Sequence, residues 1–339
     1  MHLALRLNLY RSAALEMPVD LVRLAEDLGF HSVWSAEAYG ADALSPLAYL
    51  AALTKRIRLG TSIAQLSARP PATLGMHAMT IDALAGGGRV ILGLGVSGPQ
   101  IVEGWYGQAW GRPYKQMRDY VAILRKVMDR EAPVFHEGEE ISLPYRGPGA
   151  LGQGKALRSI LHPLARIPIW LASVGPLNTE LCAEAADGWL PMAYADDSQA
   201  RLERGWAKRG GRPADFEVFV NATMQLTDDV AGVLDGMRPL TAMYVGGMGS
   251  ATHNYHRDAM ARQGFPAEAA RIQELWLAGR KDEAIAAVPE AYLESKGFFG
   301  DAQRIRRRWA EWSPPPVATG VILNGGTEEL RLAAALRDG

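Results

Sequence analysis

The stretch at residues 92–107, LGLGVSGPQIVEGWYG, carries glycines at the spacing of a dinucleotide-binding turn. Gly93, Gly95 and Gly98 form G-x-G-x-x-G directly after the apolar run 89–92. A Rossmann site also needs an uninterrupted helix after these glycines, with its N-terminus facing a pyrophosphate. Here glycines at positions 104, 107 and 111 and a proline at 113 interrupt the chain. The strand and its glycine turn are therefore predicted, but a Rossmann site is not.

Two predicted strand-to-helix turns combine backbone amides, glycine and a small hydroxyl. They consist of Gly95, Val96, Ser97 and Gly98 after one strand, and of Ala172, Ser173, Val174, Gly175 and Pro176 after another. Amides of such turns bind phosphate at a helix N-terminus. We therefore predict that both turns bind a phosphate-bearing cofactor. The residues alone leave open a second interpretation, ordinary βα turns with capping serines.

The elements that must position these turns are repeated strand–helix units. Apolar runs predict strands at residues 3–7, 31–36, 57–63, 89–92, 167–174, 188–192, 216–224 and 318–323. The first four begin about 26 to 32 residues apart, which is the period of βα units. Between strands, apolar residues recur at helical spacing, as at Leu74, Ala78 and Ile81, and His77 is expected on that same buried face.

Eight such units predict a (β/α)8 barrel, with an open doubly wound sheet as the alternative. Two stretches interrupt the repeat: residues 131–166 after the fourth strand, which contain the hairpin-like VFHEGEEISL, and residues 246–300 after the seventh. We treat residues 1–339 as one domain. The chemistry of such a barrel lies at the carboxyl ends of its strands, so both glycine turns are expected at the active site.

The composition indicates a soluble globular protein with a small partner. The 339 residues are 48% hydrophobic, and 36 basic against 37 acidic residues leave no field that attracts nucleic acid or an anionic membrane. Cys182 is the single cysteine, which excludes an internal disulfide and suits a reducing compartment. We find neither an export signal nor a run approaching the ~20 apolar residues of a membrane span. We expect a cytoplasmic protein that binds a small-molecule substrate.

Four segments together resemble the bacterial luciferase-like superfamily, in its branch dependent on the deazaflavin coenzyme F420. They read AEAYGADALSPLAYLAA (36–52), GTSIAQLSARPP (60–71), GLGVSGPQIVEGWYG (93–107) and ASVGPLNTELCAEAADGWLP (172–191). The resemblance spans nearly the whole chain. It implies a barrel in which the turns after strands four and five contact the cofactor phosphate and side chain. We also expect a homo-oligomer, as a dimer.

The resemblance assigns residues beside the cofactor ring as well. It implies a non-proline cis peptide at Ser62–Ile63, behind the ring, and an acidic residue at Glu37 that holds the ring edge or manages a proton. The alternative for Glu37 is a structural ion pair with an arginine. Relatives that oxidise sugar phosphates have a histidine where this chain has Ala38, and an acid in the loop at 96–98. These departures argue against a sugar-phosphate dehydrogenase and leave the general acid or base unassigned.

The activity implied is hydride transfer between F420 and an organic substrate that the sequence does not identify. The alternatives are an FMN-dependent monooxygenase of the same superfamily, which uses O2, and a non-catalytic flavin or phosphate binder. His253 and His256 form H-x-x-H without the glutamate of a metalloprotease, so we predict no metal site. Trp105, Tyr106 and Trp110 are candidates either for the wall of a substrate pocket or for packing between loops.

Overall fold

Parallel strands close into a barrel in this computed structural model, which describes residues 1–9, 13–173, 175–249 and 254–338. The barrel strands are β1 (His2–Arg6), β2 (Ser32–Ser35), β3 (Arg58–Thr61), β4 (Ala64–Gln65), β5 (Val90–Gly95), β6 (Ile169–Leu171), β7 (Gly188–Trp189), β8 (Glu217–Leu226) and β10 (Gly320–Asn324). Neighbouring strands pair in parallel, and β10 pairs with both β1 and β8. β3 and β4 both pair with β5 and together occupy the position of the third strand. The (β/α)8 prediction is confirmed, and the open-sheet alternative is wrong.

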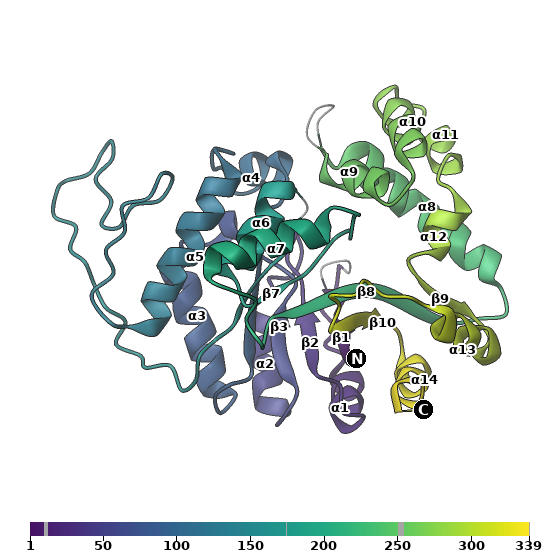
Figure 1. Cartoon of the computed structure of the whole chain (residues 1–339), viewed down its shortest axis with the longest axis horizontal. Helices are drawn as coiled ribbons and strands as arrows, with labels where there is room; N and C mark the ends of the chain where they lie inside the picture. Colours follow the sequence, from purple (N-terminus) through teal and green to yellow (C-terminus); the bar gives the residue numbers. More distant parts are fainter. Residues whose placement is uncertain (10–12, 174, 250–253, 339) are drawn as a thin grey trace.

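Helices surround the barrel (Figure 1). Those outside the second insertion are α1 (Val19–Asp27), α2 (Ser45–Leu53), α3 (Pro71–Leu84), α4 (Pro99–Gly104), α5 (Pro113–Asp129), α6 (Pro176–Ala185), α7 (Ser198–Arg209), α8 (Val230–Gly247), α13 (Ala302–Glu311) and α14 (Thr327–Asp338). Proline occupies the first turn of several of them, where its missing N–H costs no hydrogen bond. No helix of the described residues is both long enough and apolar enough to cross a bilayer.

The buried face of α3 differs from the predicted one. His77 is exposed, whereas Gly75 and Met79 are buried. The reason is tertiary, because α3 packs against α5 as well as against the barrel. A Cβ on Gly75 would lie 2.8 Å from the Val127 side chain of α5. The expectation of a buried His77 was therefore wrong.

Aromatic side chains fill the interior of the barrel. Trp34, Trp170 and Phe219 are fully buried and pack with one another, with ring centroids 5.1 Å apart for the two tryptophans and 5.0 Å for Trp170 and Phe219. Glycines make room for them: a Cβ would lie 2.4 Å from Trp34 at Gly60, 2.6 Å from Trp170 at Gly188 and 2.5 Å from Phe219 at Gly320. Side chains of Ile63 and Ala172 pack on this cluster, which therefore forms the floor beneath the strand ends.

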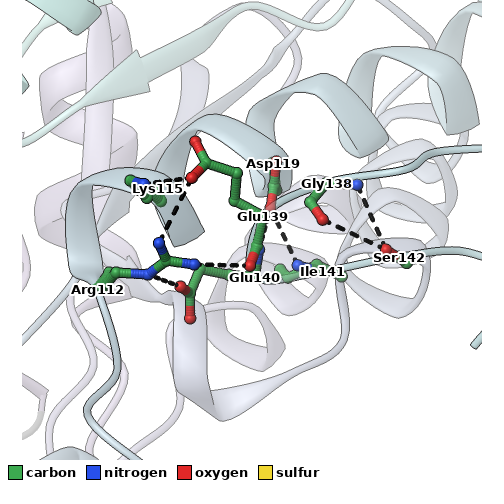
Figure 2. Close-up of polar contacts among 8 residues, drawn as sticks. All are labelled: Arg112, Lys115, Asp119, Gly138, Glu139, Glu140, Ile141 and Ser142. Carbon is green, nitrogen blue, oxygen red and sulfur yellow. Dashed lines mark hydrogen bonds and ion pairs between the residues drawn. The ribbon is translucent and has the colours of Figure 1, made fainter. Parts of the chain in front are cut away.

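The first insertion extends from the barrel beside α5 (Figure 1) and is anchored to that helix. The expected hairpin is reduced to one antiparallel bridge, His136 with Leu143. Asp119 of α5 accepts hydrogen bonds from the amides of Glu140, at 2.7 Å, and Ile141, at 3.0 Å, as Figure 2 shows. Burial opposes the charge on Asp119, but these amides outweigh it and lower the pKa of the carboxyl.

The second insertion builds a helical unit on one side of the barrel mouth (Figure 1). It contains α9 (Tyr255–Arg262), α10 (Pro266–Leu277), α11 (Lys281–Ala286), α12 (Glu290–Glu294) and strand β9 (Gly297–Gly300). Its apolar side chains form a cluster with those of α8, apart from the main core. β9 pairs with the far end of β8, at residues 223–226, and shares only Thr223 with the part of β8 that pairs with β10. This arrangement brings α8 and α9 to the carboxyl ends of the strands.

Candidate active site

A cavity of about 360 Å³ lies at the carboxyl ends of the barrel strands. From the predicted site, Glu37, Ser62, Ile63, Gly95, Val96, Ser97, Gly98, Ala172 and Gly175 line it. These residues come from the ends of β2, β3, β5 and β6, which the barrel places side by side. The fold therefore brings most of the predicted residues into one cavity.

The wall between β3 and β5 is formed by a close approach of the two strands. The Ser62–Ile63 peptide bond is cis, at the position that the sequence analysis gave for it. The Thr61 hydroxyl donates to the Gly93 carbonyl at 2.7 Å and accepts from the Gly93 amide at 2.9 Å. A Cβ on Gly93 would lie 1.9 Å from the Thr61 carbonyl oxygen. A Cβ on Gly95 would lie 2.8 Å from Ile63, so both glycines are required for strand packing.

The turn after β5 presents backbone to the cavity. Ser97 has a φ of 64°, in the left-handed region that few residues with side chains adopt. Gly98 is the N-cap residue of α4, which spans only residues 99–104, so the long helix of a Rossmann site is absent here. A Cβ on Gly98 would meet only the Gln100 side-chain oxygen, at 3.2 Å. The third glycine of the motif therefore leaves space at the cavity, whereas Gly93 and Gly95 serve strand packing.

The turn after β6 lies in the cavity wall only in part. Ala172 and Gly175 line the cavity, and a Cβ on Gly175 would meet no atom within 4 Å. Ser173 is buried, with its hydroxyl donating to Thr179 at 3.3 Å, and does not line the cavity. Pro176 is the first residue of α6 and also lies outside the lining, and Val174 is outside the described residues.

Glu37 lies in the cavity wall as half of an ion pair. Its carboxylate accepts from both terminal nitrogens of Arg69, at 2.7 Å and 2.9 Å, and from the Gln65 amide at 3.1 Å. The Glu37 side chain is 5% exposed and that of Arg69 16%. Burial opposes the arginine charge, but Glu37 outweighs it and raises the Arg69 pKa. This arrangement matches the structural alternative for Glu37, and its predicted role at a cofactor ring stays a prediction.

Several lining residues were missed by sequence reasoning. Two of them, Arg6 and Asn221, come from β1 and β8, and the Arg6 guanidinium donates to the Asn221 side chain. Others come from the second insertion and α8: Tyr244, Met248, Tyr255 and His256. No local pattern marks these positions, because tertiary packing alone brings α8 and α9 over the strand ends. The H-x-x-H spacing led us to consider His256 only as a metal ligand, a role that the sequence analysis rejected.

The three aromatic candidates do not line this cavity. Trp105 is 62% exposed. The Tyr106 hydroxyl donates to the Ala38 carbonyl at 3.4 Å, and the Trp110 ring lies 6.4 Å from that of Tyr255. Packing between loops is therefore the interpretation that the structure supports for Tyr106 and Trp110. Among the described residues, no cluster of histidine, cysteine and acidic side chains is arranged to hold a metal ion, and His253 lies outside them.

Comparison with known proteins places the chain among redox enzymes. The model of the luciferase-like monooxygenases matches residues 5–318. A Mycobacterium tuberculosis (strain ATCC 25618 / H37Rv) protein, assigned by its name to the coenzyme F420-dependent oxidoreductases, is 43% identical, with 99% of each chain covered. The coenzyme F420-dependent tetrahydromethanopterin reductase of Methanopyrus kandleri has a similar structure, with a TM-score of 0.73 at 19% identity over 98% of this chain and 97% of that one. EDTA monooxygenase from Chelativorans sp. BNC1 shares the fold too, with a TM-score of 0.67 at 15% identity over 100% of this chain and 93% of its own.

Proposed function

Because the chain belongs to the luciferase-like monooxygenase family, we propose that it is an oxidoreductase that moves a hydride between coenzyme F420 and a small organic substrate. The observation that carries this proposal is the full-length relative, 43% identical, whose name specifies F420. The fold by itself favours neither F420 nor FMN, since reductases and monooxygenases share it.

The residues of the cavity fit a deazaflavin cofactor. Two buried amide oxygens in its lining, Gln65 Oε1 and Asn178 Oδ1, have no hydrogen-bond partner among the described residues. A deazaflavin offers donors for such oxygens in its ring N–H and its ribityl hydroxyls. The amides in the turn after β5 and in the first turn of α6 would bind its phosphate, because the first amides of a helix have no intrahelical acceptor.

The protein's contribution to catalysis is binding, orientation and exclusion of water. When bound, F420 supplies a two-electron hydride carrier with little reactivity toward oxygen, because carbon replaces the reactive ring nitrogen of flavin. Ile63 and Val96 line the cavity with apolar side chains, and Ile63 packs on the buried tryptophans of its floor, which favours exclusion of water. Holding the cofactor and the substrate next to each other in this cavity would accelerate hydride transfer between them, because the reactants no longer have to meet by diffusion.

Cofactor titration tests the proposed function. We expect the purified protein to bind F420 at least about tenfold more tightly than FMN, a difference of about 1.4 kcal/mol, measured by fluorescence quenching under matched conditions. Equal or tighter binding of FMN would instead support the monooxygenase alternative. Tight F420 binding without reduction by any alcohol, aldehyde or amine in a substrate panel would favour the non-catalytic binder.

Replacing Gly98 by valine tests the phosphate turn. The new side chain would occupy the space beside Gln100 at a residue whose φ of −101° valine tolerates, so the fold should persist. Because the side chain blocks the approach of a phosphate to the backbone, F420 affinity should fall by roughly 1 to 3 kcal/mol with little change in melting temperature. Gly104→Val, at a glycine with no atom near its Cβ and outside the lining, is the matched control. An unchanged F420 affinity in Gly98→Val would indicate that the turn is an ordinary βα connection and not a phosphate site.

A further inference from the structure

His256 faces the cavity from the first turn of α9 and is held there by its neighbours. The Asn254 side chain accepts from the amides of His256, at 3.1 Å, and Arg257, at 3.0 Å. Asn254 also donates to the Val245 carbonyl of α8, at 2.7 Å, and is only 1% exposed. The start of α9 is therefore fixed to α8, and with it the position of His256.

The imidazole of His256 is packed but has unused hydrogen-bonding capacity. Its ring lies on that of Tyr244, with centroids 4.6 Å apart. Neither ring nitrogen has a hydrogen-bond partner in the part of the chain that the structure describes. Burial lowers the pKa of His256 to about 4, so the imidazole is neutral near pH 7. A neutral imidazole offers one N–H donor and one nitrogen acceptor, so both nitrogens are available to hydrogen-bond a bound molecule.

The other titratable groups of the cavity wall are engaged or unsuited to moving a proton near neutral pH. The Glu37 carboxylate is held by Arg69, and its neighbour Ala38 contributes only a methyl group. Arg6 retains its proton at all physiological pH values and donates to Asn221. Burial raises the pKa of Tyr255 above its ordinary value, so its hydroxyl is a poor acid. The remaining titratable groups of the wall are the phenols of Tyr39 and Tyr244, which are far weaker bases than an imidazole. His256 is therefore the proton acceptor of the cavity wall.

The cavity has two unlike walls. One consists of the strand ends and turns that fit the cofactor, and the other of Tyr244, Met248, Tyr255 and His256, from α8, α9 and the residue after α8. In Figure 1, α4 and α6 stand on one side of the barrel mouth and α9 on the other. A substrate between cofactor and α9 would meet aromatic and thioether surface and one imidazole. Such a wall suits a molecule with an apolar body and one hydroxyl or carbonyl oxygen.

We propose that His256 is a catalytic residue that binds the substrate oxygen and carries its proton during hydride transfer, an inference that rests on the proposed function. In the oxidative direction, the O–H bond of an alcohol breaks and its proton passes to the imidazole nitrogen. The C–H bond breaks and its hydrogen leaves with the electron pair to oxidised F420, while the C=O bond forms. The imidazolium then releases this proton, because burial favours the neutral imidazole.

The test uses cyclohexanol as probe, with oxidised F420 and the full-length protein. His256→Phe keeps a planar ring against Tyr244 but removes both nitrogens, and His256→Gln restores a donor and an acceptor. We expect kcat to fall roughly 100-fold or more in His256→Phe and less in His256→Gln, with the Kd of F420 changed less than twofold in both. His77→Phe, at an exposed histidine of α3, is the matched control and should retain wild-type kinetics.

A second readout does not depend on turnover. In protein labelled with ¹⁵N-histidine and loaded with F420, cyclohexanone should shift the ring-nitrogen resonances of His256 and leave those of His77 unchanged. Wild-type kinetics in His256→Phe would overturn the proposal, and so would unmoved His256 resonances at saturating cyclohexanone. Failure to bind F420 is a different outcome, because it contradicts the proposed function itself and removes the basis of this inference.

Discussion

Replacing Arg69 by methionine is expected to lower the free energy of unfolding by about 3 to 5 kcal/mol, because it leaves the Glu37 carboxylate buried without its cation. The two contacts of 2.7 Å and 2.9 Å make this pair bidentate, and Glu37 is 5% exposed. Urea denaturation measures the loss. Loss of stability would identify Glu37 as a structural group that shapes the cavity wall, rather than as a free acid or base.

Two further variants distinguish a structural role of Glu37 from a role at the cofactor. Arg69→Met combined with Glu37→Leu removes the unpaired charge and should recover much of the lost stability. Arg271→Met breaks an ion pair with Glu274 whose side chains are 47% and 66% exposed, so its effect should stay within about 1 kcal/mol. If Arg69→Met left stability intact but slowed single-turnover hydride transfer, Glu37 would act on the cofactor as the family resemblance implies.

Replacing Trp170 by alanine is the second change with a large expected effect. Its side chain is fully buried between Trp34 and Phe219, in the layer on which Ile63 and Ala172 pack. Truncation removes this contact surface and leaves a cavity that the closed barrel cannot collapse to fill, so we expect a loss of about 3 to 5 kcal/mol. F420 affinity should fall as well, because the floor beneath the proposed cofactor site loses its support.

The matched control for this change is Trp105→Ala. Trp105 is 62% exposed, so its truncation should change the unfolding free energy by no more than about 0.5 kcal/mol. Thermal melting followed by near-ultraviolet circular dichroism measures both variants. A loss below about 1 kcal/mol for Trp170→Ala would show that the barrel interior tolerates a void and is not the rigid support described above.

Much of the barrel was predictable because its signals are local. Apolar runs of strand length alternate with helical periodicity, and prolines and glycines mark where helices begin and end. For the same reason the two glycine turns were predicted at the cavity, since parallel strands deliver their following turns to one end of a barrel. The exposed His77 shows the limit of periodicity, because the buried face of α3 depends on its contact with α5.

Local patterns in the sequence specify the strand–helix repeat, the barrel end at which the chemistry lies and, through the resemblance of its motifs, the redox family. The roles of residues within the site follow from the packing of the folded chain. This packing assigned Gly93 and Gly95 to strand packing and left Gly98 with only the Gln100 side chain near the position of a Cβ, because only a folded chain shows what a Cβ would meet. It also paired Glu37 with Arg69 and brought His256 over the strand ends, about 219 residues after Glu37 in the sequence. Such contacts depend on how distant elements pack, and no local periodicity or spacing encodes that packing.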